Sequence, residues 1–296
     1  MKLRQSSKNL VKRALFLNLF LISCLIFGCS SSTKPTYLKE TIDKAIQDIC
    51  KKEYQIDVKA KLVGETVWVY VPVKDIFVKS DKPEKYLERF AIEKINDDFK
   101  EESLRLEYAI KVVPEQEKYQ DYKYNKDVME KLNNVWKVLR RVVFSMERGT
   151  AKEPQFFCLV TADIKNGFEI KEIFYYLDLK KVSYEFISWD EYHHRSIQDT
   201  NISPEIIDDK EGLHLNYKDI TMADFIAAQI QHRIKLKFQK PEVDKNADID
   251  KEILKIIVYT IKTYNFRNFT AVELNNLLTS SKTILNQGAV WARPTE

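Results

Sequence analysis

The sequence predicts an α+β fold in which antiparallel β-hairpins pack against amphipathic helices on one face. Apolar residues recur with helical spacing in several segments. Three of these segments are each followed by a pair of β-like stretches joined by a turn, beginning near residues 40, 127 and 250. Helices followed by hairpins favour an antiparallel sheet with helices on one side. The recurrence also raises the hypothesis of a duplicated αββ unit.

The first unit follows a polar N-terminal segment. Residues 41–53 carry apolar side chains at helical spacing and predict a helix. Alternation over residues 56–62 and a β-branched run over residues 67–71 predict a hairpin that turns at Gly64. We expect Pro72 to end the second strand, because proline cannot donate a ladder hydrogen bond.

The next segment predicts a helix and then a strand. Pro83 suits the first turn of a helix, and the helical spacing is carried by Leu87, Ala91, Ile95 and Phe99. Alternation over residues 104–112 then predicts a strand. Residues 114–125 are rich in Glu, Lys, Gln and Tyr and are expected to form a solvated connector.

The second unit has the clearest helix of the chain, over residues 128–143, where the apolar residues form one stripe. Residues 156–164 and 168–176 flank Asn166-Gly167, a strong hairpin signal. Two short helical pieces are expected after Asp178, the second with Ser188 and Glu191 as a capping box, and then a polar loop over residues 198–212.

The C-terminal part predicts two helices and a hairpin. One helix starts at Thr221, with Asp224 in the capping-box position, and is expected to end at Pro241. A charged linker runs to Asp250, and Asp248 or Asp250 is expected to begin the next helix, over residues 253–264. Residues 269–274 and 283–285 predict the third hairpin, and a helix over residues 272–278 is the alternative.

The N-terminus has the pattern of an export signal. Residues 1–13 contain five basic residues and no acidic one. The fourteen residues that follow, 14–27, are apolar except for Asn18 and Ser23. A membrane-spanning helix needs about 20 apolar residues, so this run suits a signal better than a permanent anchor. An uncleaved anchor is the alternative. Without these residues the chain has 43 basic and 44 acidic residues, so the basic pI does not indicate nucleic-acid binding.

The end of the signal reads Ile26, Phe27, Gly28, Cys29 and is followed by a serine-rich stretch. Here the sequence resembles bacterial lipoprotein precursors, although Phe27 is larger than the residue usual at that place. The resemblance implies cleavage between Gly28 and Cys29, acylation of Cys29, and a membrane anchor through that lipid. Cys24 ends a second match, but cleavage there would leave an apolar N-terminus. Ser30 after the cysteine resembles outer-membrane rather than inner-membrane sorting in Gram-negative lipoproteins.

On this interpretation the chain divides into four parts: a lipoprotein signal peptide over residues 1–28, a polar tether over residues 29–36, a first α+β unit over residues 37–113, and a larger α+β region over residues 125–296. The last two could also pack together as one domain. Two cysteines would remain beyond the lipid site, Cys50 and Cys158, each within an apolar pattern. Unpaired core residues are the preferred interpretation, and a Cys50–Cys158 disulfide is the alternative in an oxidising compartment.

Catalytic and cofactor motifs are absent from the sequence. The five glycines outside the signal are scattered, so no phosphate-binding loop is present, and we expect no nucleotide, nucleic-acid or cofactor partner. Asp190, Glu191 and His194 have a spacing that could place metal ligands on one helix face, but no further ligand is apparent and no metal is expected.

These observations predict a membrane-tethered bacterial lipoprotein of the cell envelope that binds a partner or takes part in assembly. The alternative is a lipid-anchored hydrolase whose site assembles from distant residues, including His193, His194 and nearby acids.

Overall fold

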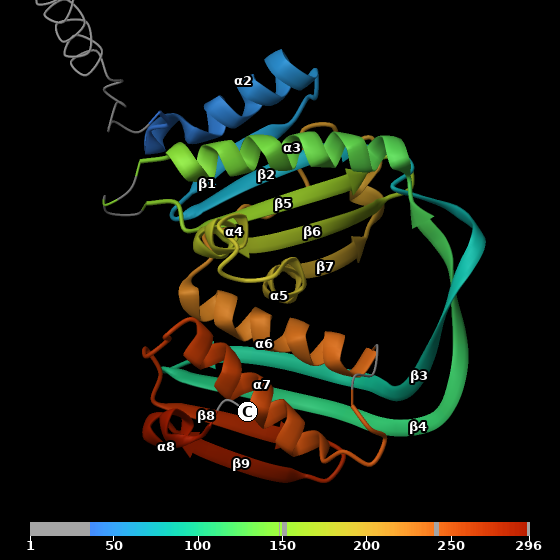
Figure 1. Cartoon of the computed structure of the whole chain (residues 1–296), viewed down its shortest axis with the longest axis vertical. Coiled ribbons are helices and arrows are strands. Elements are labelled where there is room, and N and C mark those ends of the chain that lie inside the picture. Colours follow the sequence, from blue (N-terminus) through green and yellow to red (C-terminus); the bar gives the residue numbers. More distant parts are fainter. Residues whose placement is uncertain (1–35, 148, 150–152, 240–242, 295–296) are drawn as a thin grey trace, which may run out of the picture. The chain divides into compact units, whose positions relative to one another are not determined.

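The computed structural model describes residues 36–147, 149, 153–239 and 243–294. Tyr37–Glu296 form one compact unit. Gly28, Cys29 and the signal segment lie outside the described residues, as does Pro241. The α+β class predicted from the sequence is confirmed, with two mixed sheets and helices packed on each (Figure 1).

The first sheet has the strand order β1-β2-β5-β6-β7. Its strands are β1 (Lys59–Val63), β2 (Thr66–Val73), β5 (Phe156–Asp163), β6 (Phe168–Tyr175) and β7 (Ile197–Ile202). All neighbours are antiparallel except β2 and β5, which run parallel at the centre. The first two predicted hairpins are therefore confirmed, and they join side by side in one sheet.

Helices cover one face of this sheet, and they are α2 (Ile42–Tyr54), α3 (Lys126–Ser145) and α4 (Tyr176–Ser183). Alternate β2 residues, Val67 and Val69 among them, pack under these helices with Phe157 and Leu159 of β5. The opposite face, with Trp68, Tyr70 and Phe156, is buried by the segment 204–220, which begins with the short 3-10 helix η2 (Pro204–Ile206), and by the start of α6 (Met222–Gln239). Both faces of the central strands are thus removed from water.

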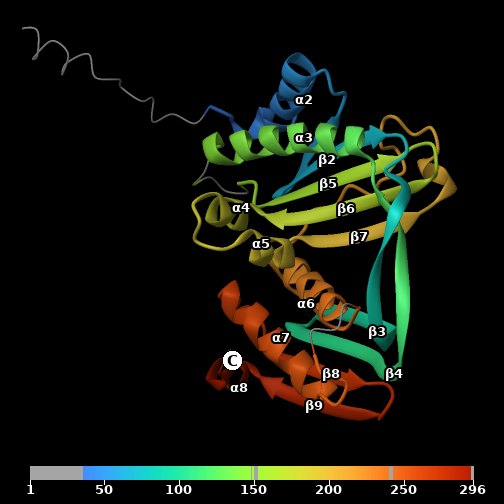
Figure 2. The same cartoon turned by 45° about the vertical axis from the view of Figure 1, so that its right-hand side comes forward.

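The second sheet has the order β3-β4-β8-β9. Its strands are β3 (Phe77–Lys100), β4 (Ser103–Tyr124), β8 (Ala271–Asn276) and β9 (Ser281–Asn286), again with a parallel central pair, β4 and β8. The helices α6 and α7 (Ile249–Thr263) pack on one face of it, and α8 (Gln287–Ala292) follows β9 (Figure 2). Gln231 of α6 donates a hydrogen bond to the Ile95 carbonyl of β3 at 2.8 Å.

The parts of β3 and β4 nearest the first sheet form an exposed two-stranded ribbon, Val78–Glu88 paired with Gln116–Lys123, which we call the arm. Cross-strand ion pairs lie along it or just beyond its end nearest the second sheet, including Lys85 with Glu117 at 2.5 Å and Arg89 with Glu115 at 2.7 Å. At the base, the Phe77 ring packs on Tyr124 and on Phe168 of the first sheet, with centroids 4.8 and 5.5 Å apart.

A buried polar network joins the helices of the two sheets through α5 (Trp189–Arg195). The Asp178 carboxylate, 1% exposed, accepts from Arg195 at 2.9 Å and from the Tyr264 hydroxyl at 2.8 Å. Glu191 accepts from Arg195 and from Arg233 of α6, at 2.7 and 3.1 Å. Arginines that share carboxylates in this way make strong, directional contacts.

Several predicted helix starts are confirmed by their hydrogen bonds. Ser188 accepts from the Glu191 backbone at 3.0 Å, and the Thr221 hydroxyl and Asp224 carboxylate each accept from the other's backbone N–H. Asp248 is the N-cap of α7, accepting from the Lys251 backbone at 3.1 Å. The helices predicted over residues 41–53, 128–143 and 253–264 and the third hairpin are also present. Whether the αββ units descend from a duplication stays a prediction.

The helix predicted from Pro83 to Phe99 is wrong, because this segment is strand β3. Register shifts, two of which lie between Glu88 and Phe90 and between Ile92 and Lys94, interrupt the alternation. A bulge inserts one residue and moves the next side chains to the other face. The residues on either side of the shift between Ile92 and Lys94 therefore share the covered face of the sheet. They are Phe90 and Ile92 before it and Ile95 and Phe99 after it, and their spacing imitates that of a helix.

The predicted connector over residues 114–125 is also wrong, since β4 continues to Tyr124. Pro114 lies where the pairing passes from Val112 to Gln116, so its missing N–H interrupts no ladder bond. Pro72 does not end its strand either, and pairs with Ala162. Within the expected loop over residues 198–212, the part up to Ile202 belongs to β7.

Candidate functional site

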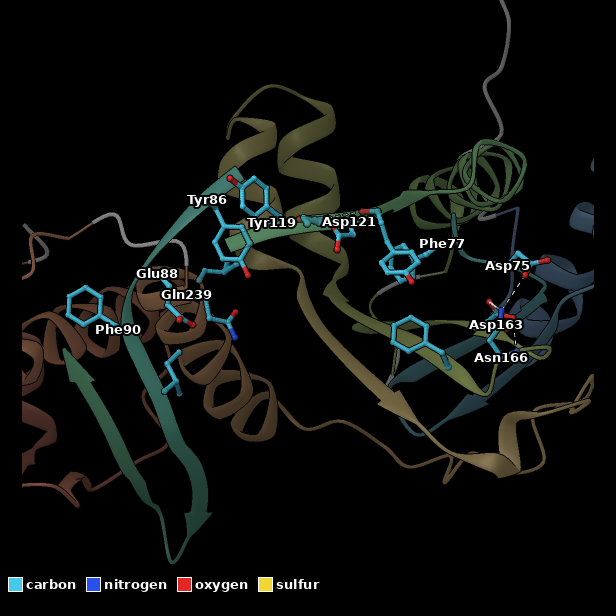
Figure 3. A pocket seen from close by; sticks show the side chains of 15 residues that line it. Asp75, Phe77, Tyr86, Glu88, Phe90, Tyr119, Asp121, Asp163, Asn166 and Gln239 are labelled. Atoms are coloured by element: carbon cyan, nitrogen blue, oxygen red, sulfur yellow. Dashed lines mark hydrogen bonds between the residues drawn. The ribbon is translucent and has the colours of Figure 1, made fainter. Parts of the chain in front are cut away.

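A groove runs along the base of the arm, between β3, β4, the first sheet and the end of α6 (Figure 3). It is an open cavity of about 1140 Å³. Its aromatic lining comes from both sheets and consists of Phe77, Tyr86, Phe90, Tyr119, Tyr122 and Phe168. Tyr119 and Tyr122 are more than half exposed, which is unusual for side chains that carry so much apolar surface.

The groove is acidic, and no lysine or arginine is among the described residues that line it. Its carboxylates are Asp75, Glu88, Asp121 and Asp163. A hydrogen bond from Lys165 holds the pKa of Asp75 below its ordinary value. Burial opposes ionisation of Asp163, but hydrogen bonds from Asn166 and the Ile76 backbone lower its pKa overall. Asp75 and Asp163, at the right of Figure 3, are therefore ionised at neutral pH.

The groove is held open by well-packed supports. Asp163 accepts from the Ile76 backbone at 2.9 Å and from the Asn166 side chain at 2.9 Å, which fixes the chain just before β3. The Phe77 ring between Tyr124 and Phe168 fixes the base of the arm. A preorganised surface of exposed tyrosines is the type of surface that proteins use to bind other proteins, since tyrosine offers large contact area at low entropic cost.

The residues that the sequence singled out for metal are not assembled into a site. In the described part of the chain, no three His, Cys, Asp or Glu side chains gather closely enough to hold a metal ion. Asp190 is exposed, and Glu191 is occupied by Arg195, Arg233 and the Tyr259 hydroxyl. Ionic partners lower the pKa of Glu191 against the effect of burial.

Cys50 and Cys158 are both free and buried, on opposite faces of the first sheet. The structure thus has the unpaired arrangement rather than the disulfide. Burial raises the pKa of Cys50 to about 11 and raises that of Cys158 further. Thiols with such pKa values are poor nucleophiles.

Among the described residues, no hydrogen bond joins a histidine ring to a serine, threonine or cysteine side chain. His214 comes nearest to a catalytic arrangement, but both of its ring nitrogens are taken by carboxylates, Asp209 at 2.5 Å and Glu169 at 2.8 Å. The side chain is 7% exposed. Burial lowers the pKa of His214, but these two hydrogen bonds outweigh it and raise the pKa overall. His214 is therefore a structural imidazolium that ties the segment 204–220 to β6.

This ion triad predicts a pH dependence of stability. The pKa of His214 is raised above 6.5, so its stabilisation is complete below that pH and is lost as the pH rises through the folded-state pKa. The pKa of Asp209 is lowered from 3.8 to about 2, against the effect of burial, by hydrogen bonds from His214 and the backbone, so its contribution is lost in acid. At a pH between the pKa of Asp209 and the raised pKa of His214, His214→Asn should lower the free energy of unfolding by about 2 kcal/mol.

Urea denaturation of both proteins at about pH 5.5 and about pH 8.5 measures this difference. The cost of the substitution should be larger at the lower pH. An equal cost at both values would contradict the charged state of His214.

The sequence did not point to the arm tyrosines. Tyr119, Tyr122 and Tyr124 fall in a stretch that its polar composition marked as a connector. Their density within six residues was the available signal.

No protein-family model, no curated protein and no solved structure matches this chain. In the described part, no helix is long and apolar enough to cross a bilayer. Function is therefore inferred from the groove and from the N-terminal sequence.

Proposed function

We propose that the chain is a bacterial lipoprotein, held at a membrane of the cell envelope through an acylated Cys29, and that it acts as a binding module. The observation that carries the binding role is the groove at the arm, where exposed tyrosines lie among carboxylates. The lipid anchor is supported by the residues from Ile26 to Ser32, and their order favours the outer membrane in a Gram-negative host.

The groove suits a protein segment that carries apolar and basic side chains. Tyrosine rings attract cations through their faces as well as apolar groups through their area. The Asp121 carboxylate would pair with lysine or arginine of the partner, whereas Asp75 is already paired with Lys165. The proposed ligand is therefore a segment of another envelope protein that carries apolar and basic side chains.

The lipid-anchored hydrolase with His193 and His194 stays the alternative prediction. His214 would not serve as its base, because both of its ring nitrogens are bound to carboxylates.

Substitution of the groove tyrosines tests the binding role. Tyr86→Ser combined with Tyr119→Ser should weaken partner retention at least about tenfold, since buried tyrosines are common hot spots of interfaces. The protein is purified from detergent-solubilised membranes of its own host, and the proteins that accompany it are quantified by mass spectrometry.

The matched control is Tyr184→Ser with Phe186→Ser, an exposed aromatic pair away from the groove, 62% and 78% exposed. The control should keep the partner. If the groove variant keeps the same partners, or if both variants lose them, the groove is not the binding site.

A further inference from the structure

A second cavity lies beneath α3, against the helix-covered face of β5 and β6, and next to α5 and α6. Its volume is about 880 Å³, and it shares only Leu236 with the groove at the arm. Much of its wall is apolar, with Trp136 of α3, Trp189 of α5, Leu159 of β5 and Ile170 of β6. A cavity of this size and lining suits a small organic molecule.

Among the described residues, two hydroxyl groups in this cavity make no hydrogen bond of normal geometry, although they lie close to each other and to Glu172. They are the Tyr192 hydroxyl and the Ser196 hydroxyl, both buried, in residues only 3% and 4% exposed. Buried polar groups in native proteins are nearly always paired, and an unpaired one costs about 1–3 kcal/mol. Two such hydroxyls at the wall of one cavity are therefore placed to make better-aligned hydrogen bonds with a ligand.

A carboxyl group stands beside these hydroxyls. Glu172 lies on β6 between Ile170 and Phe174, at a position that faces the helices, and no other acidic residue is among the described residues that line the cavity. Burial raises the pKa of Glu172 to about 7, opposed by Ser196. Burial and then the charge of Glu172 raise the pKa of Tyr192. The nearby Ser196 hydroxyl offsets part of this rise. The three groups thus lie close enough to influence one another.

The basic groups of the cavity do not neutralise Glu172. Lys137 donates to Asn134 at 2.9 Å and lies over the Tyr54 ring, and the exposed Arg140 acts on the pKa of Tyr192 rather than on that of Glu172. Burial, with Arg233 next in effect, lowers the pKa of His232 to about 4, so this ring is neutral at pH 7. The other titratable groups of the cavity wall are Tyr124 of β4 and His193 and His194 of α5.

We propose that this cavity binds a small amine with an aromatic or aliphatic body, whose ammonium group is held by Glu172, Tyr192 and Ser196 while its body packs against Trp136 and Trp189. An ammonium group has three N–H donors, and the site offers a carboxylate and two hydroxyl oxygens as acceptors. The aromatic walls add a favourable face for a cation. This site is separate from the proposed partner groove and does not depend on it.

Three probes with the same phenyl body and different ends test the proposal: 2-phenylethylamine, 2-phenylethanol and 3-phenylpropionate. Calorimetric titration of the full-length protein in detergent should give the amine a Kd on the order of 1 mM or tighter, at least about tenfold tighter than the alcohol, with the carboxylate weakest. Glu172→Gln should reduce amine affinity to the level of the alcohol and leave alcohol affinity unchanged. Tyr192→Phe should weaken the amine by a smaller factor.

The matched control is Glu130→Gln, an exposed carboxylate on α3 that should leave all affinities unchanged. Amine affinity should also fall as the pH decreases from about 8 to about 6, because Glu172 takes up a proton, and this dependence should vanish in Glu172→Gln. Equal affinity for the three probes, unaltered amine binding in Glu172→Gln, or no binding at about 10 mM would each overturn the proposal.

Discussion

Asp178→Asn is expected to lower the free energy of unfolding by about 3 kcal/mol. The carboxylate is buried and holds Arg195 and the Tyr264 hydroxyl, so its loss leaves a buried guanidinium with one carboxylate fewer. Removing one partner of a buried ion pair costs about 3–5 kcal/mol, and the lower end applies because Glu191 still binds Arg195. Urea denaturation followed by circular dichroism gives the measurement.

The same substitution should reduce the cooperativity of unfolding. Asp178 and Arg195 belong to the helices of the first sheet, whereas Tyr264, Arg233 and Tyr259 follow or lie on the helices of the second. Weakening their junction should lower the denaturant m-value as well as the midpoint. Asp190→Asn, an exposed carboxylate of α5, should change stability by no more than about 0.5 kcal/mol. Equal effects of the two substitutions would show that the network contributes no special stability.

Cys29→Ser is expected to abolish lipid attachment completely. Each buried methylene of an acyl chain contributes about 0.8 kcal/mol, so two or more chains on one residue give stable anchoring and their loss removes it. Cells grown with labelled palmitate should label the wild-type protein, whose mature form should begin at Cys29. The variant should carry no label and retain the full signal segment.

Cys24→Ser is the matched control, because Cys24 ends the competing motif in the same segment. It should keep the label and the same mature N-terminus. A label that survives in Cys29→Ser and disappears in Cys24→Ser would move the anchor to Cys24. No label in the wild type would leave the uncleaved anchor as the better interpretation.

Much of the fold could be predicted because local signals and tertiary packing agree. The stripe of α3 and the Asn166-Gly167 turn each identify an element by its own residues, and Ser188, Thr221 and Asp248 act as helix caps as their positions predict. Cys158 lies in the core strand that its apolar neighbours indicated. In these segments, period and capping chemistry depend on residues a few positions apart.

The arm could not be predicted by the same means. Register shifts within the arm and beyond it disturb the alternation of β3, and Pro83 and Pro114 lie where the pairing of β3 with β4 is interrupted. Its many charges are satisfied by the opposite strand, as in Lys85 with Glu117, so a polar stretch that resembles a loop is a strand. The strand can be recognised only when its pairing partner is known, because Lys85 and Glu117 are 32 residues apart in the chain.

The two candidate sites were hidden for a related reason. The groove combines Asp75, Tyr119 and Phe168, which come from strands or turns of different sheets, and the second cavity combines Glu172 with Tyr192 and Ser196 across α5 and β6. None of these residues forms a motif with its sequence neighbours. The spacing of Glu191 and His194 did suggest a site, but Glu191 is occupied by Arg195, one helical turn further on, and by Arg233, which is distant in sequence.

The most direct test of the binding role is photocrosslinking in living cells of the host. A benzoylphenylalanine residue is placed at Tyr119 in the groove or, for comparison, at Tyr184, which is 62% exposed elsewhere on the protein. Irradiation should join the Tyr119 position, and not the Tyr184 position, to one envelope protein, seen as a single adduct and identified by mass spectrometry. No adduct from Tyr119, or the same adducts from both positions, would contradict a partner-binding groove at the arm.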